Sequence, residues 1–194
     1  MAKKLVFVLL MIVVFSAAAA YAGTVQLPKT GQTTCYDAAG AVVACTGTGQ
    51  DADKGKGVAW PSPRFTDNGN GTVTDGLTGL VWLKNANCFS TQTWTQAVAD
   101  ANGLANGSCS LTDGSTAGQW RLPNVDELES LVNGGQSNTA TWLNTQGFSS
   151  VQSDGYWSGT TFAVRTSDAG GVGMYDGSVS FYYKTDAFYV WPVR

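Results

Sequence analysis

The side chains that could do chemistry in this chain are acidic, aromatic or sulfur-containing, because the sequence has no histidine. Without an imidazole there is no Ser-His-Asp or Cys-His triad and no histidine metal ligand. The stretch WRLPNVDELESLV holds an acidic cluster of Asp126, Glu127 and Glu129. A catalytic carboxylate pair needs a raised pKa in a cleft, whereas these residues suit the start and solvent face of a helix. We therefore expect no catalytic residue and no enzyme activity.

Aromatic residues suggest ligand binding instead, since the chain contains seven tryptophans. Sugars stack their C–H faces on exposed aromatic rings, while carboxylates and amides bind their hydroxyls. Trp82, Trp94 and Trp120 lie within apolar blocks and are expected in the core. The blocks DGYWSG and MYDG, with two basic residues nearby, give the candidate ligand-binding residues Asp154, Tyr156, Trp157, Arg165, Tyr175, Asp176 and Lys184. Tyr175, beside a turn, is the ring most expected to be exposed.

Carboxylates and amides could also hold calcium. The stretch DNGNG places Asp67, Asn68 and Asn70 together, but Gly69 and Gly71 stand where an EF-hand loop needs oxygen ligands. A turn is the favoured interpretation. Calcium through Asp154, Asp168 and Asp176 stays open, yet no spacing identifies a site, so we assign no metal and no cofactor.

The four cysteines are Cys35, Cys45, Cys88 and Cys109. In an exported protein an even number of cysteines predicts disulfides, and three pairings are possible. We favour Cys35–Cys45 and Cys88–Cys109, because each pair brackets one local segment. No two cysteines have the C-x-x-C spacing of a zinc site.

The chain begins MAKKLVFVLLMIVVFSAAAAYAG, which has the basic start, apolar core and small-residue cleavage pattern of a secretory signal peptide over residues 1–22. The mature chain would have no membrane span, and its nine basic and fourteen acidic residues give a net charge near −5. A nucleic-acid partner needs a basic face and is not expected. The protein is predicted to be secreted, periplasmic or on the cell surface.

Two helices are predicted. The first starts at Thr93, with Gln96 closing a capping box, and buries Trp94, Ala97, Val98, Ala101 and Leu104. The second starts at Asn124, with Glu127 closing its capping box, and ends at Gly134-Gly135. Pro123 keeps the preceding residues extended, so we expect a structural strand-to-helix corner at Trp120, Arg121, Pro123, Asn124 and Glu127. Arg121 is expected to pair with Asp126 or Glu127.

The remaining patterns predict β hairpins. Turns at Ala39-Gly40, Asn70-Gly71 and Asp176-Gly177 separate short alternating segments, and DAFYVWPVR reads as a last strand. Because no regular βαβ alternation or nucleotide loop appears, the fold class is α+β. We expect a Cys-stapled hairpin and connector over residues 23–59, followed by one domain over residues 60–194.

Five blocks, taken in order, resemble the Lcl C-terminal domain family: DGLTGLVWLKN, TWTQAVADANGL, WRLPNVDELESLV, YWSGTTF and YVWPVR. That family is named after the C-terminal domain of a bacterial collagen-like adhesin. The resemblance implies a C-type-lectin-like fold, similar also to that of formylglycine-generating enzymes, and it suggests glycan binding and attachment. This sequence departs from the adhesin because it has no Gly-X-Y repeat and is acidic, which fits sulfated polymers poorly.

Three functions follow in order of support. The first is an exported, non-enzymatic binding module that holds a surface glycan in adhesion or envelope contact. The second is a structural or protein-interaction module whose partner is an envelope or appendage protein. The third, a formylglycine-type oxidase, has the least support because all four cysteines are expected in disulfides. Fold alone does not choose among them.

Overall fold

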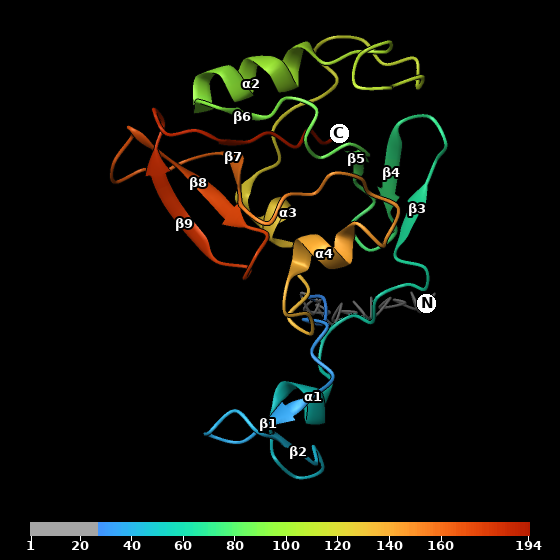
Figure 1. Ribbon diagram of the computed structural model, residues 1–194, viewed down its shortest axis with the longest axis vertical. Coiled ribbons are helices and arrows are strands. Elements are labelled where there is room, and N and C mark those ends of the chain that lie inside the picture. Colours follow the sequence, from blue (N-terminus) through green and yellow to red (C-terminus); the bar gives the residue numbers. More distant parts are fainter. Residues whose placement is uncertain (1–26) are drawn as a thin grey trace, which may run out of the picture.

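The computed structural model describes residues 27–194, so the predicted signal peptide lies outside the described residues. The strands form three sheets (Figure 1), with β1 and β2 paired, β3-β4-β5 in a second sheet, and the order β6-β10-β7-β8-β9 in a third. The strands are β1 (Cys35–Tyr36), β2 (Val42–Val43), β3 (Phe65–Asp67), β4 (Thr72–Asp75), β5 (Val81–Leu83), β6 (Thr91–Gln92), β7 (Gly155–Thr161), β8 (Asp168–Gly173), β9 (Val179–Tyr183) and β10 (Phe188–Tyr189). The helices are α1 (Asp51–Lys54), α2 (Trp94–Gly103), α3 (Val125–Glu129) and α4 (Thr139–Leu143).

The strands β7 and β8 of the five-stranded sheet are largely buried on both faces, and most of their residues are accordingly apolar, small or glycine. Tyr156 of β7 packs into the larger core with α3 and α4, whereas its neighbour Trp157 packs into a second core with Ala97 and Ala101 of α2. Successive strand residues point to opposite faces, so one strand serves both cores. All pairings in the sheets are antiparallel except that of β10 with β7.

Glycines in β8 allow neighbouring groups to approach the strand closely. A Cβ at Gly170 would lie 3.0 Å from Ser158 Oγ, and one at Gly171 would lie 3.1 Å from the carbonyl oxygen of Tyr156. A side chain at either position would therefore require a neighbour to shift. The predicted hairpin with Asp176-Gly177 at its turn is confirmed by the pairing of β8 with β9.

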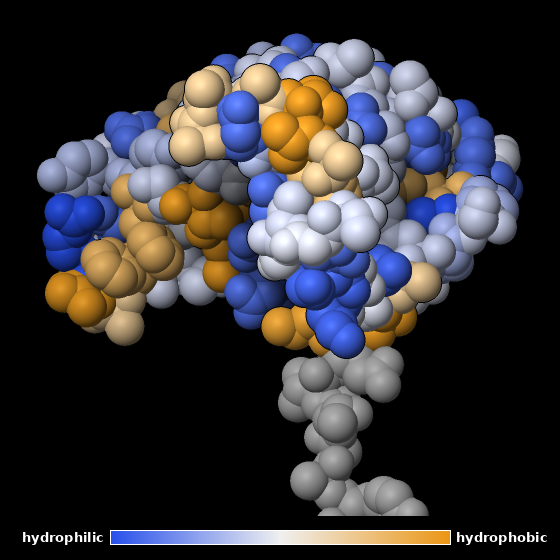
Figure 2. All heavy atoms as spheres, turned by 90° about the horizontal axis from the view of Figure 1, so that it is seen from below, coloured by the Kyte–Doolittle hydropathy of each residue, from blue (hydrophilic) through white to orange (hydrophobic). Residues whose placement is uncertain are grey.

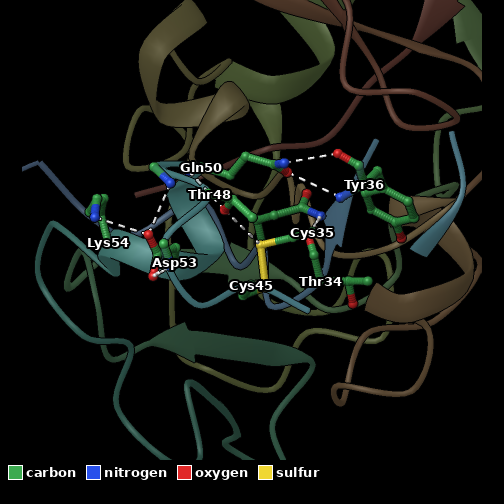
Figure 3. The surroundings of a disulfide bond; sticks show 11 residues. Thr34, Cys35, Tyr36, Cys45, Thr48, Gln50, Asp53 and Lys54 are labelled. Atoms are coloured by element: carbon green, nitrogen blue, oxygen red, sulfur yellow. Dashed lines mark hydrogen bonds and ion pairs between the residues drawn. A yellow bond between two sulfur atoms is a disulfide. The ribbon is translucent and has the colours of Figure 1, made fainter. Parts of the chain in front are cut away.

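The two predicted disulfides are both present, and no cysteine is free. Cys88–Cys109 brackets α2 and packs against the larger core. Cys35–Cys45 closes the β1–β2 hairpin (Figure 3), where the Gln50 amide bonds both the N–H and the C=O of Tyr36. Disulfides are typical of proteins from oxidising compartments. Across the described residues, no helix is both long and apolar enough to cross a membrane.

The second predicted helix is shorter than expected. Its capping box is confirmed, because Asn124 Oδ1 accepts from the N–H of Glu127 and the Glu127 carboxylate accepts from the N–H of Asn124. The helix α3 ends at Glu129, however, not at Gly134-Gly135. The chain continues in tighter turns, in which Leu131 and Val132 donate to carbonyls three residues back.

The prediction for the first helix was wrong in two details. Thr93 is the N-cap of α2, but its side chain makes no capping hydrogen bond. Gln96 does not close the predicted capping box, because its Nε2 donates to Asp100 at 2.8 Å. Val98 is 37% exposed rather than buried. The prediction of two helices also missed α1 and α4, so the described residues contain four.

Candidate functional site

A hollow of about 480 Å³ lies between the start of the described chain, the turn after α1 and the segment around α4. We call it the tryptophan pocket, because Trp60 and Trp142 supply its largest side chains. Figure 2 shows the molecule from below, with the Cys-stapled hairpin region of Figure 1 nearest the viewer. The lining residues are Lys29, Gly31, Gln32, Thr33, Ala52, Gly55, Ala59, Trp60, Asn133 and Trp142.

The two indole rings pack against each other on the pocket wall. Their centroids are 5.6 Å apart and their planes are inclined by 34°. Trp142 also meets the edge of Phe65 at 5.8 Å, which ties it to the core of the domain. Both tryptophans are half-buried, so each presents part of its ring to the hollow.

A buried arginine fixes the position of Trp60. The Arg64 guanidinium carbon lies 4.5 Å from the centre of the Trp60 ring. Arg64 also forms a bidentate pair with Asp75, at 3.0 and 2.8 Å, and its Nη2 donates to the carbonyl of Ser130 at 2.7 Å. The cation–π contact and the buried ion pair both constrain the position of the Arg64 guanidinium, and through it the position of the Trp60 ring.

Polar groups face the same hollow. Asn133 is only 6% exposed, and its Oδ1 accepts from the N–H of Gly135 at 2.9 Å. Its Nδ2 has no hydrogen-bond partner within residues 27–194 and is a free donor at the pocket. Gln32 donates its Nε2 to the carbonyl of Thr34, which leaves its Oε1 as an acceptor. The pocket therefore offers both donors and acceptors beside an aromatic wall.

Gly31 brings the N-terminal segment close to Asn133. Its φ is +86°, and a Cβ there would lie 2.2 Å from Asn133 Oδ1 and 2.9 Å from Cη2 of Trp60. The carbonyl of the preceding Thr30 accepts from the N–H of Gly134 at 2.8 Å. Only glycine fits this approach, so the pocket wall depends on it.

Two predicted ligand-binding residues are corrected by the structure. Tyr156 and Trp157 are both 0% exposed and lie in the two cores on either side of β7. Burial raises the pKa of Tyr156, whose hydroxyl accepts from the N–H of Gln152. A ring without an exposed face cannot stack on a sugar, so neither residue can do so in this conformation.

The other five candidates do not form one site, because they lie at opposite ends of β8. Asp154, Tyr175 and Asp176 lie at its Gly173 end, where the Asp154 carbonyl accepts from Met174 N–H and Tyr175 is 45% exposed. At the Asp168 end, Arg165 pairs with Asp168 at 2.7 Å. Strand geometry separates the two ends by roughly 17 Å.

Lys184 is also occupied at the Asp168 end. Its ammonium lies 4.1 Å from the centre of the Trp94 ring and donates to Thr161 Oγ1 and to the Thr166 carbonyl. These contacts pin β9 to its neighbours, which is a structural role. Among residues 27–194 no group of three or more metal-ligating acidic or sulfur side chains occurs.

The predicted corner is built as expected. Trp120 is buried. The backbone N–H of Arg121 donates to the carbonyl of Val193, and the carbonyl of Arg121 accepts from the N–H of Val193. The Arg121 guanidinium donates to both carboxylate oxygens of Glu127 at 2.7 Å. The pKa of Glu127 is lowered chiefly by this arginine and further by the N–H of Asn124, against the opposing effect of burial. Both partners are thus committed to each other.

None of the residues that line the tryptophan pocket was predicted from the sequence to bind a ligand. Trp60 sits in AWPSP, next to a proline and a glycine-broken connector rather than in an apolar block, and this was the available signal. Trp142 and Asn133 carry no local signal that separates them from the core. Their meeting with Trp60 depends on how distant segments pack.

Comparison with known families finds a match to the Lcl C-terminal domain over residues 71–194. A search of curated proteins found no match. Of the residues that line the tryptophan pocket, only Asn133 and Trp142 fall within the matched region. The match covers well over half of the sequence and includes the five blocks from GLVWL to YVWPVR. The chain therefore belongs to the Lcl C-terminal domain family.

Proposed function

We propose that this protein is an exported, non-enzymatic bacterial module that binds carbohydrate in the tryptophan pocket and serves adhesion or envelope contact. The observation that carries the proposal is the pairing of two half-buried indoles with the free amide donor of Asn133 in one hollow. Export is supported by the signal-peptide pattern and by the two disulfides.

The chemistry of the pocket suits a sugar ring. The apolar C–H face of a pyranose stacks on indole, and its hydroxyls need donors and acceptors at the edge of that contact. Asn133 Nδ2 and Gln32 Oε1 supply one of each. The pocket volume, about 480 Å³, is within the range of small-ligand sites.

The test combines a glycan array with two-dimensional NMR of the indole N–H groups. Seven tryptophans give seven indole signals, assigned with single Trp→Phe variants. We expect a sugar from the array to shift the signals of Trp60 and Trp142 and to leave those of the fully buried Trp82, Trp120, Trp157 and Trp191 unchanged.

A matched pair of variants checks the site. Trp142→Ala should weaken sugar binding about five- to thirtyfold, since stacking on one ring contributes about 1–2 kcal/mol. Tyr175→Ala, which removes a half-exposed ring far from the pocket, should leave binding unchanged. If no glycan on the array binds, the proposal is contradicted. It is also contradicted if Tyr175→Ala abolishes binding while Trp142→Ala leaves it unchanged.

A protein-interaction module is the second candidate, and the edge strand β9 favours it. Val179 and Tyr183 are 41% and 58% exposed, and no charged residue or proline protects the strand. Figure 2 shows apolar side chains gathered on the side where Figure 1 places β8 and β9. Val179→Lys would abolish capture of a partner protein that uses this edge, and it would not change sugar binding at the pocket.

A further inference from the structure

We infer that the sugar unit held in the tryptophan pocket carries a single carboxylate, as a hexuronate does, and that Lys29 binds this group. This rests on the proposed function and adds the ligand class to it. The pocket has one lysine in its lining, and that lysine lies beside the aromatic wall. Its backbone carbonyl accepts from the indole N–H of Trp60 at 2.8 Å, which holds the lysine next to the ring.

Among residues 27–194, Lys29, Lys56 and Lys184 form no ion pair, and of these three only Lys29 lines the pocket. Within residues 27–194, six basic residues form ion pairs, namely Lys54, Arg64, Lys84, Arg121, Arg165 and Arg194, and Lys29 is not among them. The two acidic residues of neighbouring α1, Asp51 and Asp53, form no ion pair with Lys29. Asp51 accepts from the hydroxyl of Thr30, and Asp53 pairs with Lys54 and accepts from the amides of Gly47 and Gly49.

The electrostatics of the wall also disfavour a cationic ligand. Arg64 covers one face of Trp60 at 4.5 Å, so the electron density of that ring is already drawn toward a cation. Asp75 neutralises Arg64, which leaves Lys29 as the one charged side chain among the residues that line the pocket. A ligand with a negative group beside its ring complements this arrangement.

The same charges argue against a densely sulfated polymer. Such a chain needs several lysines and arginines close together, because each sulfate requires its own counter-charge. Here most basic side chains are already paired, and the mature chain has a net charge near −5. A single ammonium beside an aromatic wall fits one carboxylate.

The experiment compares two glycosides that differ only at C6, methyl β-glucuronide and methyl β-glucoside, titrated into the full mature chain while the indole signals are followed. We expect the glucuronide to bind about fivefold tighter, as for an ion pair worth about 1 kcal/mol. About 0.5 M salt should remove most of this preference. Lys29→Gln should equalise the two affinities.

Lys56→Gln is the matched control, because Lys56 follows α1 nearby but does not line the pocket. This variant should keep the preference for the glucuronide. Equal affinities in the wild type would overturn the carboxylate inference while the proposed sugar binding stands. If neither glycoside shifts Trp60 or Trp142, the inference also falls, and the glycan array then decides the proposed function separately. Heparin binding tighter than the glucuronide and insensitive to Lys29→Gln would overturn the inference as well.

Discussion

The Glu127 side chain takes part in two interactions at the start of α3, the capping box and an ion pair. Its carboxylate accepts from the backbone N–H of Asn124, closing the capping box, and from both terminal nitrogens of Arg121. Arg121 in turn belongs to the backbone bridge with Val193 near the end of the chain. The capping box was predicted from the sequence, and Arg121 was predicted to pair with Asp126 or Glu127, because these residues lie close together in sequence across a proline corner.

The pair gives stability a defined pH dependence. The pKa of Glu127 is held below its ordinary 4.5, first by Arg121. A depressed folded pKa means that the contribution is fully present above about pH 4.5 and is lost as pH falls through the folded value. Because the Arg121 side chain is 50% exposed, solvent screening limits the contribution to about 0.5–1 kcal/mol.

Glu127→Gln should therefore lower the free energy of unfolding by about 0.5–1 kcal/mol at pH 7 and by less at pH 3. Glutamine still serves the capping box, so the variant isolates the ion pair. Asp126→Asn is the control, since Asp126 makes no ion pair within the described part of the chain. Chemical denaturation at both pH values measures the difference, and an equal loss for the two variants would contradict the assignment.

Among the elements, those with strong local signals were predictable. Each of the three predicted hairpin turns contains a glycine at positive φ, at Gly40, Gly71 and Gly177. The helix α4 was not predicted, although Asn138 caps it by accepting from the N–H of Thr141. Five residues give too little periodicity, and its helicity depends on the tertiary bond from Ala140 N–H to the Met174 carbonyl.

The disulfides belong to different elements and should have separable effects. Cys88–Cys109 joins the two ends of α2 to the larger core, whereas Cys35–Cys45 closes only the β1–β2 hairpin. Chain-entropy arguments give each about 3 kcal/mol, for separations of 21 and 10 residues.

Replacing Cys88 and Cys109 with alanine should lower the melting temperature of the domain by roughly 10 °C. Replacing Cys35 and Cys45 should leave that transition in place and speed hydrogen exchange in the hairpin alone. Calorimetry and exchange mass spectrometry distinguish the two. A large drop in the domain transition after loss of Cys35–Cys45 would show that the hairpin stabilises the domain.

At the scale of the whole molecule, the candidate site escaped sequence analysis because it combines segments far apart in the chain. Trp60 and Trp142 come from distant segments, and much of the rest of the pocket wall comes from residues 29–33 and Asn133. Tyr156 and Trp157, by contrast, were predicted to bind ligand but are buried. At these positions α2 and α3 cover the two faces of the sheet, and sequence periodicity carries no information about such covering elements.

Gly31 is the position at which this packing can be tested. Gly31→Ala would place a Cβ within 2.2 Å of Asn133 Oδ1, so the N-terminal segment should separate from the loop and the pocket should open. Gly40→Ala is a matched control, because Gly40 has nearly the same φ, +83° against +86°, but nothing lies within 4 Å of its added Cβ. Both variants share a strain of about 1–2 kcal/mol from the left-handed backbone.

Any difference in hydrogen exchange or sugar binding between Gly31→Ala and Gly40→Ala reports the contact of residue 31 with Asn133. The amide of Gly134, which donates to the Thr30 carbonyl at 2.8 Å, should lose its protection from hydrogen exchange in Gly31→Ala and keep it in Gly40→Ala. Sugar binding should be lost in the first variant only, while the melting transition of the domain is the same in both. Equal protection of Gly134 in the two variants would mean that the N-terminal segment is held by other contacts, and the tryptophan pocket would then not depend on the approach of Gly31.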